Sequence, residues 1–249
     1  LWSVCYGSGQ FVAVGEGGTI LTSPDGLAWT KRVSGNTLWL VGTGYGNGLF
    51  VVVGDQGTIV TSSDGITWTT RRTGGTRINA VAYGNGIFLA IDEAGGSWNS
   101  TDGVSWSSHG TAQSAQLRGL VYAAPIFVIT GANGTIETTF DGVVFTARST
   151  RTTNFLESVA FGRRLFVTTG ASGATYSSRD AVNWNGQPNA PASFRGIEFF
   201  NNQFVGVGAN GSVATSFDGC EWTSRSTSTN QLLTAVTASE SAAIAVGFG

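Results

Sequence analysis

The chain has 249 residues, 11% of them charged, and a formal net charge of −2 at pH 7. A chain of this length buries roughly 70–75% of its unfolded surface, so it can form a stable core without disulfide bonds or bound metals. The weakly acidic balance argues against nucleic acid or an anionic membrane surface as a partner, because both need a strongly basic face. No apolar run approaches the roughly 20 residues that a spanning helix requires, so we expect no membrane insertion.

The composition favours strands and tight turns. Glycine occurs 37 times, Trp 8 times and Phe 15 times, whereas Lys31 is the only lysine. Cys5 and Cys220 lie far apart in unlike sequence contexts, so they indicate no disulfide framework. Because the sequence contains no Met, we expect it to be a processed or partial product. The missing N-terminal residues could have carried a targeting signal.

The first 36 residues are predicted to form four short strands. These strands are residues 1–7, 11–15, 19–23 and 29–32. Glycine-rich turns separate the first three strands, and a reversal at Asp25 joins the last two. The second strand, FVAVG, is apolar throughout, which suggests burial on both faces.

Five further units repeat this order, and a partial unit ends the chain. We place the units at residues 1–36, 37–75, 76–113, 114–152, 153–190 and 191–228, with the partial unit at 229–249. A Phe stands fourteen residues before the Asp in every complete unit, at Phe11, Phe50, Phe88, Phe127, Phe166 and Phe204. Four strands in about 39 residues, with turn glycines in register, are typical of one blade of a β-propeller.

Each complete unit carries the pattern Ser-x-Asp-Gly-x-x-Trp, called the Asp motif below. Its aspartates are Asp25, Asp64, Asp102, Asp141, Asp180 and Asp218. Its aromatic residues are Trp29, Trp68, Trp106, Phe145, Trp184 and Trp222. An Asp at a turn accepts hydrogen bonds from backbone N–H groups downstream, the following Gly tolerates an unusual dihedral, and the Trp buries a large ring between blades. We therefore interpret the motif as a device that locks one turn per blade.

The Asp motif resembles the Asp-box, or BNR, repeat of sialidases, some glycoside hydrolases, sortilin-type receptors and photosystem II assembly factors. The resemblance covers essentially the whole chain and implies a β-propeller. This motif is one residue shorter than the family pattern, and Ala181 and Phe145 depart from it. Those departures weaken any transfer of one member's function to this chain.

The prediction for the fold is an all-β, single-domain β-propeller spanning residues 1–249, built from four-stranded antiparallel blades. We expect seven blade positions, six of them complete and the seventh holding only its two inner strands; a six-bladed ring is the alternative. The outer strands of the seventh blade would be residues before Leu1 or would be left unpaired. An exposed sheet edge there is a place for self-association.

Catalytic and metal chemistry finds little support in the sequence. The motif aspartates are separated by whole blades, so no two could share a metal or a proton, and one acid per turn is too few for calcium. His109, the only histidine, is predicted to lie in a surface loop, and no Gly-x-Ser-x-Gly elbow accompanies it. We expect no metal, no cofactor and no catalytic residue.

The basic residues gather at one end of the predicted blades. Ten of the thirteen lie in or beside the connections between units: Lys31, Arg32, Arg71, Arg72, Arg77, Arg118, Arg148, Arg151, Arg195 and Arg225. Arg118, Glu157 and Arg195 occupy equivalent positions in consecutive units and could form one ion network near the channel mouth. The candidate binding residues are Arg77, Asn79, Arg118, Glu157 and Arg195. The alternative is that these arginines cap strand ends and pair with nearby acids, which are Glu16, Asp55, Asp92, Glu93 and Glu157.

These features favour a non-enzymatic propeller that binds a protein or glycan through its Arg-rich face, because guanidinium groups contact carboxylates or sulfates in bidentate fashion. We expect a bacterial protein in an extracellular, cell-surface or periplasmic location. One alternative is a glycoside hydrolase or lyase, with Glu157 and either Glu198 or Glu93 as its carboxyl pair. Another is a structural subunit of a surface assembly.

Overall fold

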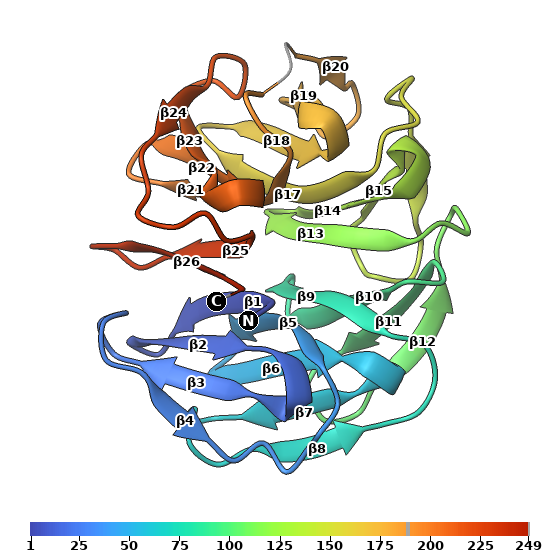
Figure 1. Ribbon diagram of the computed structural model, residues 1–249. Coiled ribbons are helices and arrows are strands. Elements are labelled where there is room, and N and C mark those ends of the chain that lie inside the picture. Colours follow the sequence, from blue (N-terminus) through green and yellow to red (C-terminus); the bar gives the residue numbers. More distant parts are fainter. Residues whose placement is uncertain (188–189, 249) are drawn as a thin grey trace.

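A computed structural model of the chain shows seven antiparallel β-sheets arranged in a ring (Figure 1). It describes residues 1–187 and 190–248. Six of the sheets have four strands, and the seventh has two. This confirms the prediction of an all-β propeller with six complete four-stranded blades. Within the described residues, no helix is long and apolar enough to cross a membrane.

Consecutive segments of the chain form consecutive blades. Blades 1 and 2 contain β1 (Ser3–Gly7), β2 (Gln10–Val14), β3 (Ile20–Ser23), β4 (Thr30–Arg32), β5 (Leu40–Gly46), β6 (Leu49–Gly54), β7 (Ile59–Ser62) and β8 (Thr69–Arg72). Blades 3 and 4 contain β9 (Ile78–Gly84), β10 (Ile87–Asp92), β11 (Gly96–Ser100), β12 (Ser107–Gly110), β13 (Leu117–Ala123), β14 (Ile126–Gly131), β15 (Ile136–Thr139) and β16 (Thr146–Arg148). Blades 5 and 6 contain β17 (Leu156–Gly162), β18 (Leu165–Gly170), β19 (Thr175–Ser178), β20 (Asn185–Gly186), β21 (Phe194–Phe200), β22 (Gln203–Gly208), β23 (Val213–Ser216) and β24 (Thr223–Arg225). The last two strands, β25 (Leu233–Ala238) and β26 (Ala243–Gly247), form a pair called the terminal hairpin below.

The first strand of each blade lies nearest the axis of the ring. Strands β1, β5, β9, β13, β17, β21 and β25 contact their counterparts in the next sheet around the whole ring. Because neighbouring strands are antiparallel, the first and third turns of a blade lie at one end. The second turn and the connection to the next blade lie at the other end, called the connecting face below. Backbone bonds confirm this grouping, for example Gly134 N–H to Asn154 O at 2.8 Å.

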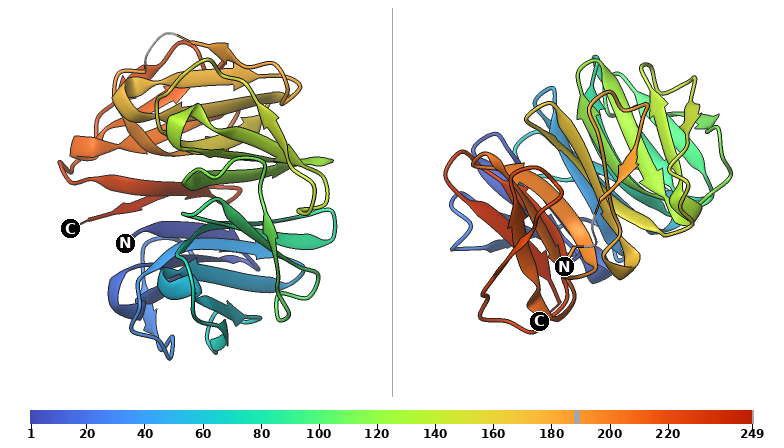
Figure 2. Two further views of the ribbon diagram at one scale, coloured as in Figure 1. Left: turned by 90° about the vertical axis from the view of Figure 1, so that its right-hand side faces the viewer. Right: turned by 90° about the horizontal axis from the view of Figure 1, so that it is seen from above.

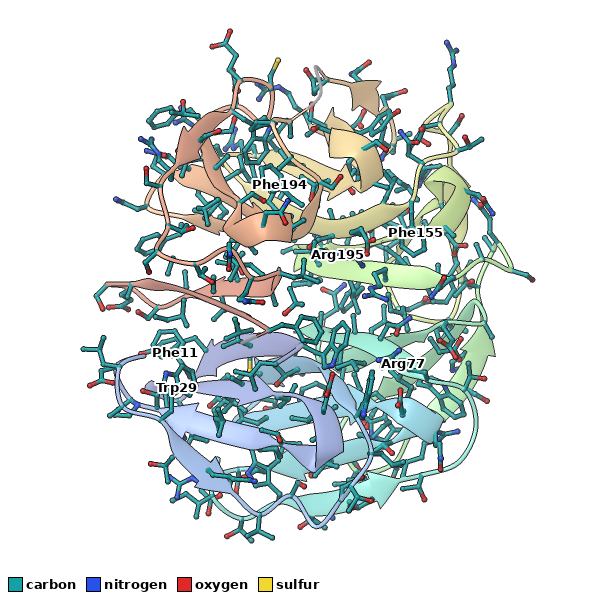
Figure 3. All side chains as sticks on the ribbon, in the orientation of Figure 1. Phe11, Trp29, Arg77, Phe155, Phe194 and Arg195 are labelled. Atoms are coloured by element: carbon teal, nitrogen blue, oxygen red, sulfur yellow. The ribbon has the colours of Figure 1, made fainter. Side chains whose placement is uncertain are left out.

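The core consists of apolar side chains pressed between adjacent blades. Val12 and Val14 of blade 1 and Phe50 and Val52 of blade 2 belong to one buried cluster, together with Trp68 of the second Asp motif. The repeated Phe and the motif Trp of one blade also contact each other, as Phe11 and Trp29 do with ring centroids 6.4 Å apart (Figure 3). The continuous apolar character of the second strand is therefore explained, because it is covered by a blade on each side.

The Asp motif of blade 2 shows how each turn is fixed. Asp64 Oδ1 accepts hydrogen bonds from Ser62 Oγ at 2.9 Å and from the backbone N–H groups of Ile66 and Thr67 at 2.8 Å each. Gly65 has a φ of 72°, and its carbonyl oxygen accepts a bond from Trp68 Nε1 at 3.1 Å. The carboxylate thus accepts hydrogen bonds from backbone N–H groups that have no backbone acceptor in the turn.

Blade 5 departs from this pattern where its sequence does. Ala181 stands at the Gly position, with a φ of 59°, and its side chain is fully buried. Asp180 still accepts the N–H groups of Val182 and Asn183 at 2.9 and 2.8 Å. The turn therefore keeps its shape although an alanine occupies the left-handed region.

The terminal hairpin lies between blade 6 and blade 1 and completes the ring (Figure 1). Its inner strand β25 contacts both β21 and β1. The two chain ends lie side by side in all views (Figures 1 and 2), and the Leu1 amino group donates to Gly247 O at 2.9 Å. Leu40 N–H donates to Gly15 O at 3.0 Å in the equivalent place between blades 1 and 2. The hairpin therefore occupies a regular blade position.

Candidate functional site

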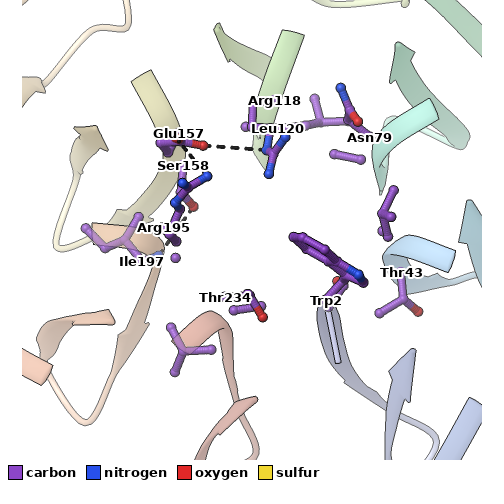
Figure 4. Close-up of a pocket in the computed structure, with 18 of the residues that line it drawn as sticks. Trp2, Thr43, Asn79, Arg118, Leu120, Glu157, Ser158, Arg195, Ile197 and Thr234 are labelled. Carbon is purple, nitrogen blue, oxygen red and sulfur yellow. Dashed lines mark hydrogen bonds and ion pairs between the residues drawn. The ribbon is translucent and has the colours of Figure 1, made fainter. Parts of the chain in front are cut away.

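A pocket of about 300 Å³ opens on the axis at the connecting face (Figure 4). The inner strand of every sheet contributes to its wall. One position recurs around the wall, and its occupants are Trp2, Val41, Asn79, Arg118, Glu157, Arg195 and Thr234. Because the seven inner strands are alike, much of the chemistry of the pocket comes from the side chains placed at this position.

Two arginines share one carboxylate at the pocket wall (Figure 4). Glu157 Oε2 lies 3.5 Å from Arg118 Nε, and Glu157 Oε1 lies 3.2 Å from an Nη of Arg195. The Glu157 side chain is only 12% exposed, whereas those of Arg118 and Arg195 are 28% and 45% exposed. Burial lowers the pKa of Arg118 more than Glu157 raises it. The carboxylate thus lies beneath two guanidinium groups, and the positive charge faces the solvent.

A third guanidinium borders the same pocket. Arg77 Nε lies 2.9 Å from Asp55 Oδ1, and its guanidinium carbon lies 5.9 Å from the ring centroid of Trp2. Trp2 stacks on Trp39 at 5.9 Å and meets the edge of Phe248 at 4.9 Å. An aromatic wall beside a cation gives the pocket an apolar side as well as a charged one.

The pocket also holds a second buried acid, Glu198. Burial raises the pKa of its carboxyl to about 6, although the Phe199 N–H donates to Oε1 at 2.9 Å and opposes the shift. Glu198 also lines a second hollow at the opposite end of the axis, beside Phe200 and Ser239. This residue therefore marks the inner part of the channel.

The structure brings all five sequence-predicted binding residues together around one pocket. Arg77, Arg118, Glu157 and Arg195 present charged groups there. Asn79 is buried, and its amide donates to Leu117 O at 2.7 Å, so its side chain joins two neighbouring inner strands. Whether the five residues bind a ligand stays a prediction.

Most other arginines on the connecting face have a structural partner. In four blades an arginine Nε donates to a threonine hydroxyl on the adjacent strand, ten residues earlier. The pairs are Arg32–Thr22 and Arg71–Thr61 at 2.8 Å, and Arg148–Thr138 and Arg225–Thr215 at 3.0 Å. Arg72 donates to Gly57 O and packs 3.8 Å from the Trp98 ring centroid. Only some of the basic residues predicted at this face therefore point toward the pocket.

His109 does not lie in a loop, as the sequence analysis expected, but in the outer strand β12. Its Nε2 lies 3.3 Å from Asn99 Oδ1, again ten residues apart. It takes the place that arginine holds in four of the other blades and that Gln187, which donates to Ser177 Oγ at 3.0 Å, holds in blade 5. No group of three His, Cys, Asp or Glu side chains in the described parts of the chain could hold a metal ion.

The motif aspartates are spread around the ring, and each carboxylate accepts hydrogen bonds from the backbone of its own turn. Hydrogen bonds from the N–H groups of Thr67 and Ile66 lower the pKa of Asp64 to about 2, and those from Ser105 and Val104 do the same for Asp102. Cys5 and Cys220 are free thiols. Burial raises the pKa of Cys5 to about 12, so it is not a nucleophile at neutral pH.

Comparison with known proteins shows likeness in structure but not in sequence. No protein-family model matches it, and no curated protein matches its sequence. YCF48 from Cyanidioschyzon merolae is similar in structure, with a TM-score of 0.77 at 13% identity over 99% of this chain and 92% of that one. A structure of YCF48 bound to D1 peptide gives a TM-score of 0.70 at 16% identity, over 90% of this chain and 79% of that one. The WD40 β-propeller domain of Doa1 gives a TM-score of 0.77 at 13% identity, over 98% and 88%. Likeness at this identity shows a shared propeller fold.

Proposed function

We propose that this protein is a non-enzymatic binding propeller whose pocket on the connecting face takes an acidic segment of a protein partner. The proposal rests on the arrangement of charged groups at the pocket wall, where two guanidinium groups lie over one carboxylate. Arg195 and Arg118 are more exposed than the carboxylate they share, so an approaching ligand meets guanidinium groups first. Guanidinium groups bind carboxylates in bidentate geometry, which suits aspartate, glutamate or a chain-terminal carboxylate.

The pocket size and its walls suit a side chain or chain end better than a whole domain. A volume of about 300 Å³ holds a few residues at most. Trp2 supplies an apolar wall opposite the charged one, so an acidic segment with an adjacent apolar residue fits both. The similar YCF48 propeller has been captured with a peptide, which supports the use of this scaffold for peptide recognition.

The test compares two arginines on the same face. A fluorescein-labelled deca-glutamate peptide serves as the probe, and its affinity is measured by anisotropy at two salt concentrations. Arg195→Gln should weaken binding about tenfold, because a lost charge-assisted bond is worth about 1.5–3 kcal/mol. Arg225→Gln removes an equally basic residue that bonds Thr215 outside the pocket, so it should leave the affinity unchanged.

A parallel measurement with a heparin oligosaccharide separates protein from glycan ligands. Binding of the peptide that weakens with salt supports the proposal, because exposed ion pairs are screened. Binding of the oligosaccharide alone, or equal losses in both variants, would overturn it in favour of a glycan ligand or a diffuse charge effect.

A further inference from the structure

A hollow of about 410 Å³ lies between blades 5 and 6, beside the outer strands β19 and β20. We call it the outer hollow, and its border includes Arg163, Ser177, Arg179, Asn185, Gln187 and Phe217. Blade 5 supplies most of this border, and the Asp motif of blade 6 supplies the rest. The outer hollow shares no lining residue with the pocket at the connecting face, so a ligand in one does not block the other.

The side chains of blade 5 leave this space open. In four other blades an arginine of the fourth strand bonds a threonine of the third strand. Blade 5 has the shorter Gln187 in place of that arginine, and Gln187 Nε2 donates to Ser177 Oγ at 3.0 Å. Serine is also smaller than threonine. Less side-chain volume therefore covers the outer strands of blade 5 at this point.

The first turn of blade 5 holds two arginines in an unusual backbone conformation. Arg163 and Arg164 have φ values of 51° and 58°. In blades 2 and 3 the same two positions hold Asn-Gly, the pair that this hairpin turn favours. An arginine rarely adopts a positive φ. Residues with such strain cluster at functional sites, and Arg163 borders the outer hollow.

Arg163 and Arg179 bring two positive charges to the outer hollow. Both residues are exposed, and Arg179 stands between Ser178 and Asp180 in the Asp motif of blade 5. In the parts of the chain that the structure describes, every ion pair lies at the connecting face. The guanidinium groups of Arg163 and Arg179 are therefore available to an anionic group of a ligand.

Phe217 adds an aromatic ring to the outer hollow. It occupies the same motif position in blade 6 that Arg179 occupies in blade 5, and it is 59% exposed. The face of an aromatic ring carries partial negative charge and packs well against C–H groups. A ligand with an apolar C–H face can therefore stack on Phe217.

Amide groups make up much of the remaining polar border. Asn183 Nδ2 donates to Asp180 Oδ2 at 2.8 Å. The exposed side chain of Asn185 has no hydrogen-bond partner among the described residues. An amide side chain both donates and accepts hydrogen bonds, as a hydroxyl group does. The outer hollow therefore suits a ligand rich in hydroxyl groups.

We propose that the outer hollow binds an acidic oligosaccharide, one that contains a uronic acid. A uronic acid combines the three features that the border requires, namely hydroxyl groups, an apolar ring face and a carboxylate. Phe217 packs against the C–H face of a sugar ring, and the amides of Asn183 and Asn185 bond its hydroxyl groups. Arg163 and Arg179 bind the carboxylate.

Other anionic ligands fit the outer hollow less well. The carboxylates of Asp180 and Asp218 also line it, and they repel the closely spaced phosphates of a nucleic acid. The same carboxylates accept hydrogen bonds from sugar hydroxyl groups. An acidic peptide carries few hydroxyl groups for the amides to bond. A ligand with sparse negative charge and many hydroxyl groups matches the whole border.

The test uses trimers of galacturonic acid and of mannuronic acid as probes, titrated into the 249-residue chain by calorimetry. We expect at least one trimer to bind with one-to-one stoichiometry, and neutral maltotriose to bind at least tenfold more weakly because it has no carboxylate. Arg179→Gln should weaken binding of the trimer at least fivefold.

Two phenylalanines provide a matched pair of variants. Phe217→Ala should weaken binding of the trimer at least fivefold. Phe140 occupies the same motif position in blade 4 and is also 59% exposed, but it lies outside the outer hollow. Phe140→Ala should therefore bind the trimer like the unaltered chain.

The strained turn gives a test that loss of folding cannot imitate. Arg163→Asn together with Arg164→Gly restores the turn sequence of blades 2 and 3. The Tm should rise, because Asn and Gly adopt a positive φ with less strain than arginine. Binding of the trimer should nevertheless weaken at least fivefold.

Several results would overturn the proposal. They are no binding of either trimer, equal binding by Phe217→Ala and Phe140→Ala, and a deca-glutamate peptide that binds more tightly than the trimers and is lost in Arg179→Gln, which would make a peptide the ligand. Arg195→Gln should leave binding of the trimer unchanged, and Arg179→Gln should leave binding of deca-glutamate unchanged. Failure here and failure of the pocket proposal can therefore be told apart.

Discussion

Ser62 Oγ donates a 2.9 Å hydrogen bond to Asp64 Oδ1, and the same serine oxygen accepts the Gly65 N–H at 2.8 Å. The same two hydrogen bonds recur in blades 1, 3 and 6 with similar distances. The carboxylate therefore accepts three bonds at one oxygen and fixes the turn that carries the Trp into the core. The turn, not a bound ligand, accounts for the repeated acid.

Acid should weaken the propeller through these turns. Backbone hydrogen bonds to the carboxylates, from Thr67 first for Asp64 and from Ser105 first for Asp102, lower both pKa values from 3.8 to about 2. The folded state thus favours the ionised form. The stabilisation is fully present above about pH 4 and is lost as the pH falls toward 2. We expect the Tm to fall over this range.

A double variant checks this origin. With Asp64→Asn and Asp102→Asn, two of the groups no longer titrate, so the fall in Tm between pH 4 and 2 should be shallower than in the unaltered chain. Calorimetry across that range measures it. An unchanged slope would assign the acid sensitivity to other carboxyls.

The turn requires glycine in the motif for two reasons: the residue has a positive φ, and the neighbouring blade leaves no room for a Cβ. Gly103 has a φ of 70°, and a Cβ there would lie 2.4 Å from Leu49 Cδ2. Gly103→Ala should destabilise the protein by about 2–4 kcal/mol, since left-handed strain and overpacking add. Urea unfolding measures the change.

Ala181→Gly is the matched control for that substitution. It relieves about 1 kcal/mol of backbone strain but loses a buried methyl worth about 0.8 kcal/mol. It should therefore leave stability within about 1 kcal/mol of the unaltered chain. A large loss in Ala181→Gly would mean that packing, not backbone conformation, governs this position.

Much of the architecture could be predicted from the sequence, because turn glycines and the Asp recur at fixed spacing. The predicted strands 1–7, 11–15, 19–23 and 29–32 overlap β1, β2, β3 and β4. Arg118, Glu157 and Arg195 were also predicted to lie near one mouth, because equivalent positions on inner strands must converge on the axis. That reasoning needs only the period and the strand order.

Other features depend on contacts that the period does not encode. Asp55 was one of five acids expected to pair with the arginines of this face, but no spacing assigns it to Arg77, because the pair joins two blades through their loops. The burial of Glu198 depends on how closely the inner strands approach. The links of arginine to threonine ten residues earlier did carry a signal, at Arg71 and Thr61 for example, and it could have separated structural arginines from those at the pocket.

Glu157 should hold the two pocket arginines in place. Glu157→Gln keeps the shape of the side chain but removes the charge that balances Arg118 and Arg195. We expect a loss of stability of about 1 kcal/mol, because the pairs are partly exposed. Binding of the deca-glutamate probe should tighten, since two guanidinium groups become free for the ligand. Weaker binding would show that Glu157 positions the arginines productively.

Glu198 should make the stability of the channel depend on pH near neutrality. Burial raises the pKa of its carboxyl from 4.5 to about 6, so the folded state binds a proton more tightly than the unfolded chain. Stability from this group is therefore full below about pH 4.5 and decreases as the pH rises through 6. The penalty above that pH is on the order of 2 kcal/mol, at 1.36 kcal/mol per pKa unit. Glu198→Gln should raise the Tm at pH 7.5 and leave it nearly unchanged at pH 4.5, measured by calorimetry at both values. A Tm gain of equal size at both pH values would mean that the amide improves packing or hydrogen bonding and that the carboxylate charge is not the cause.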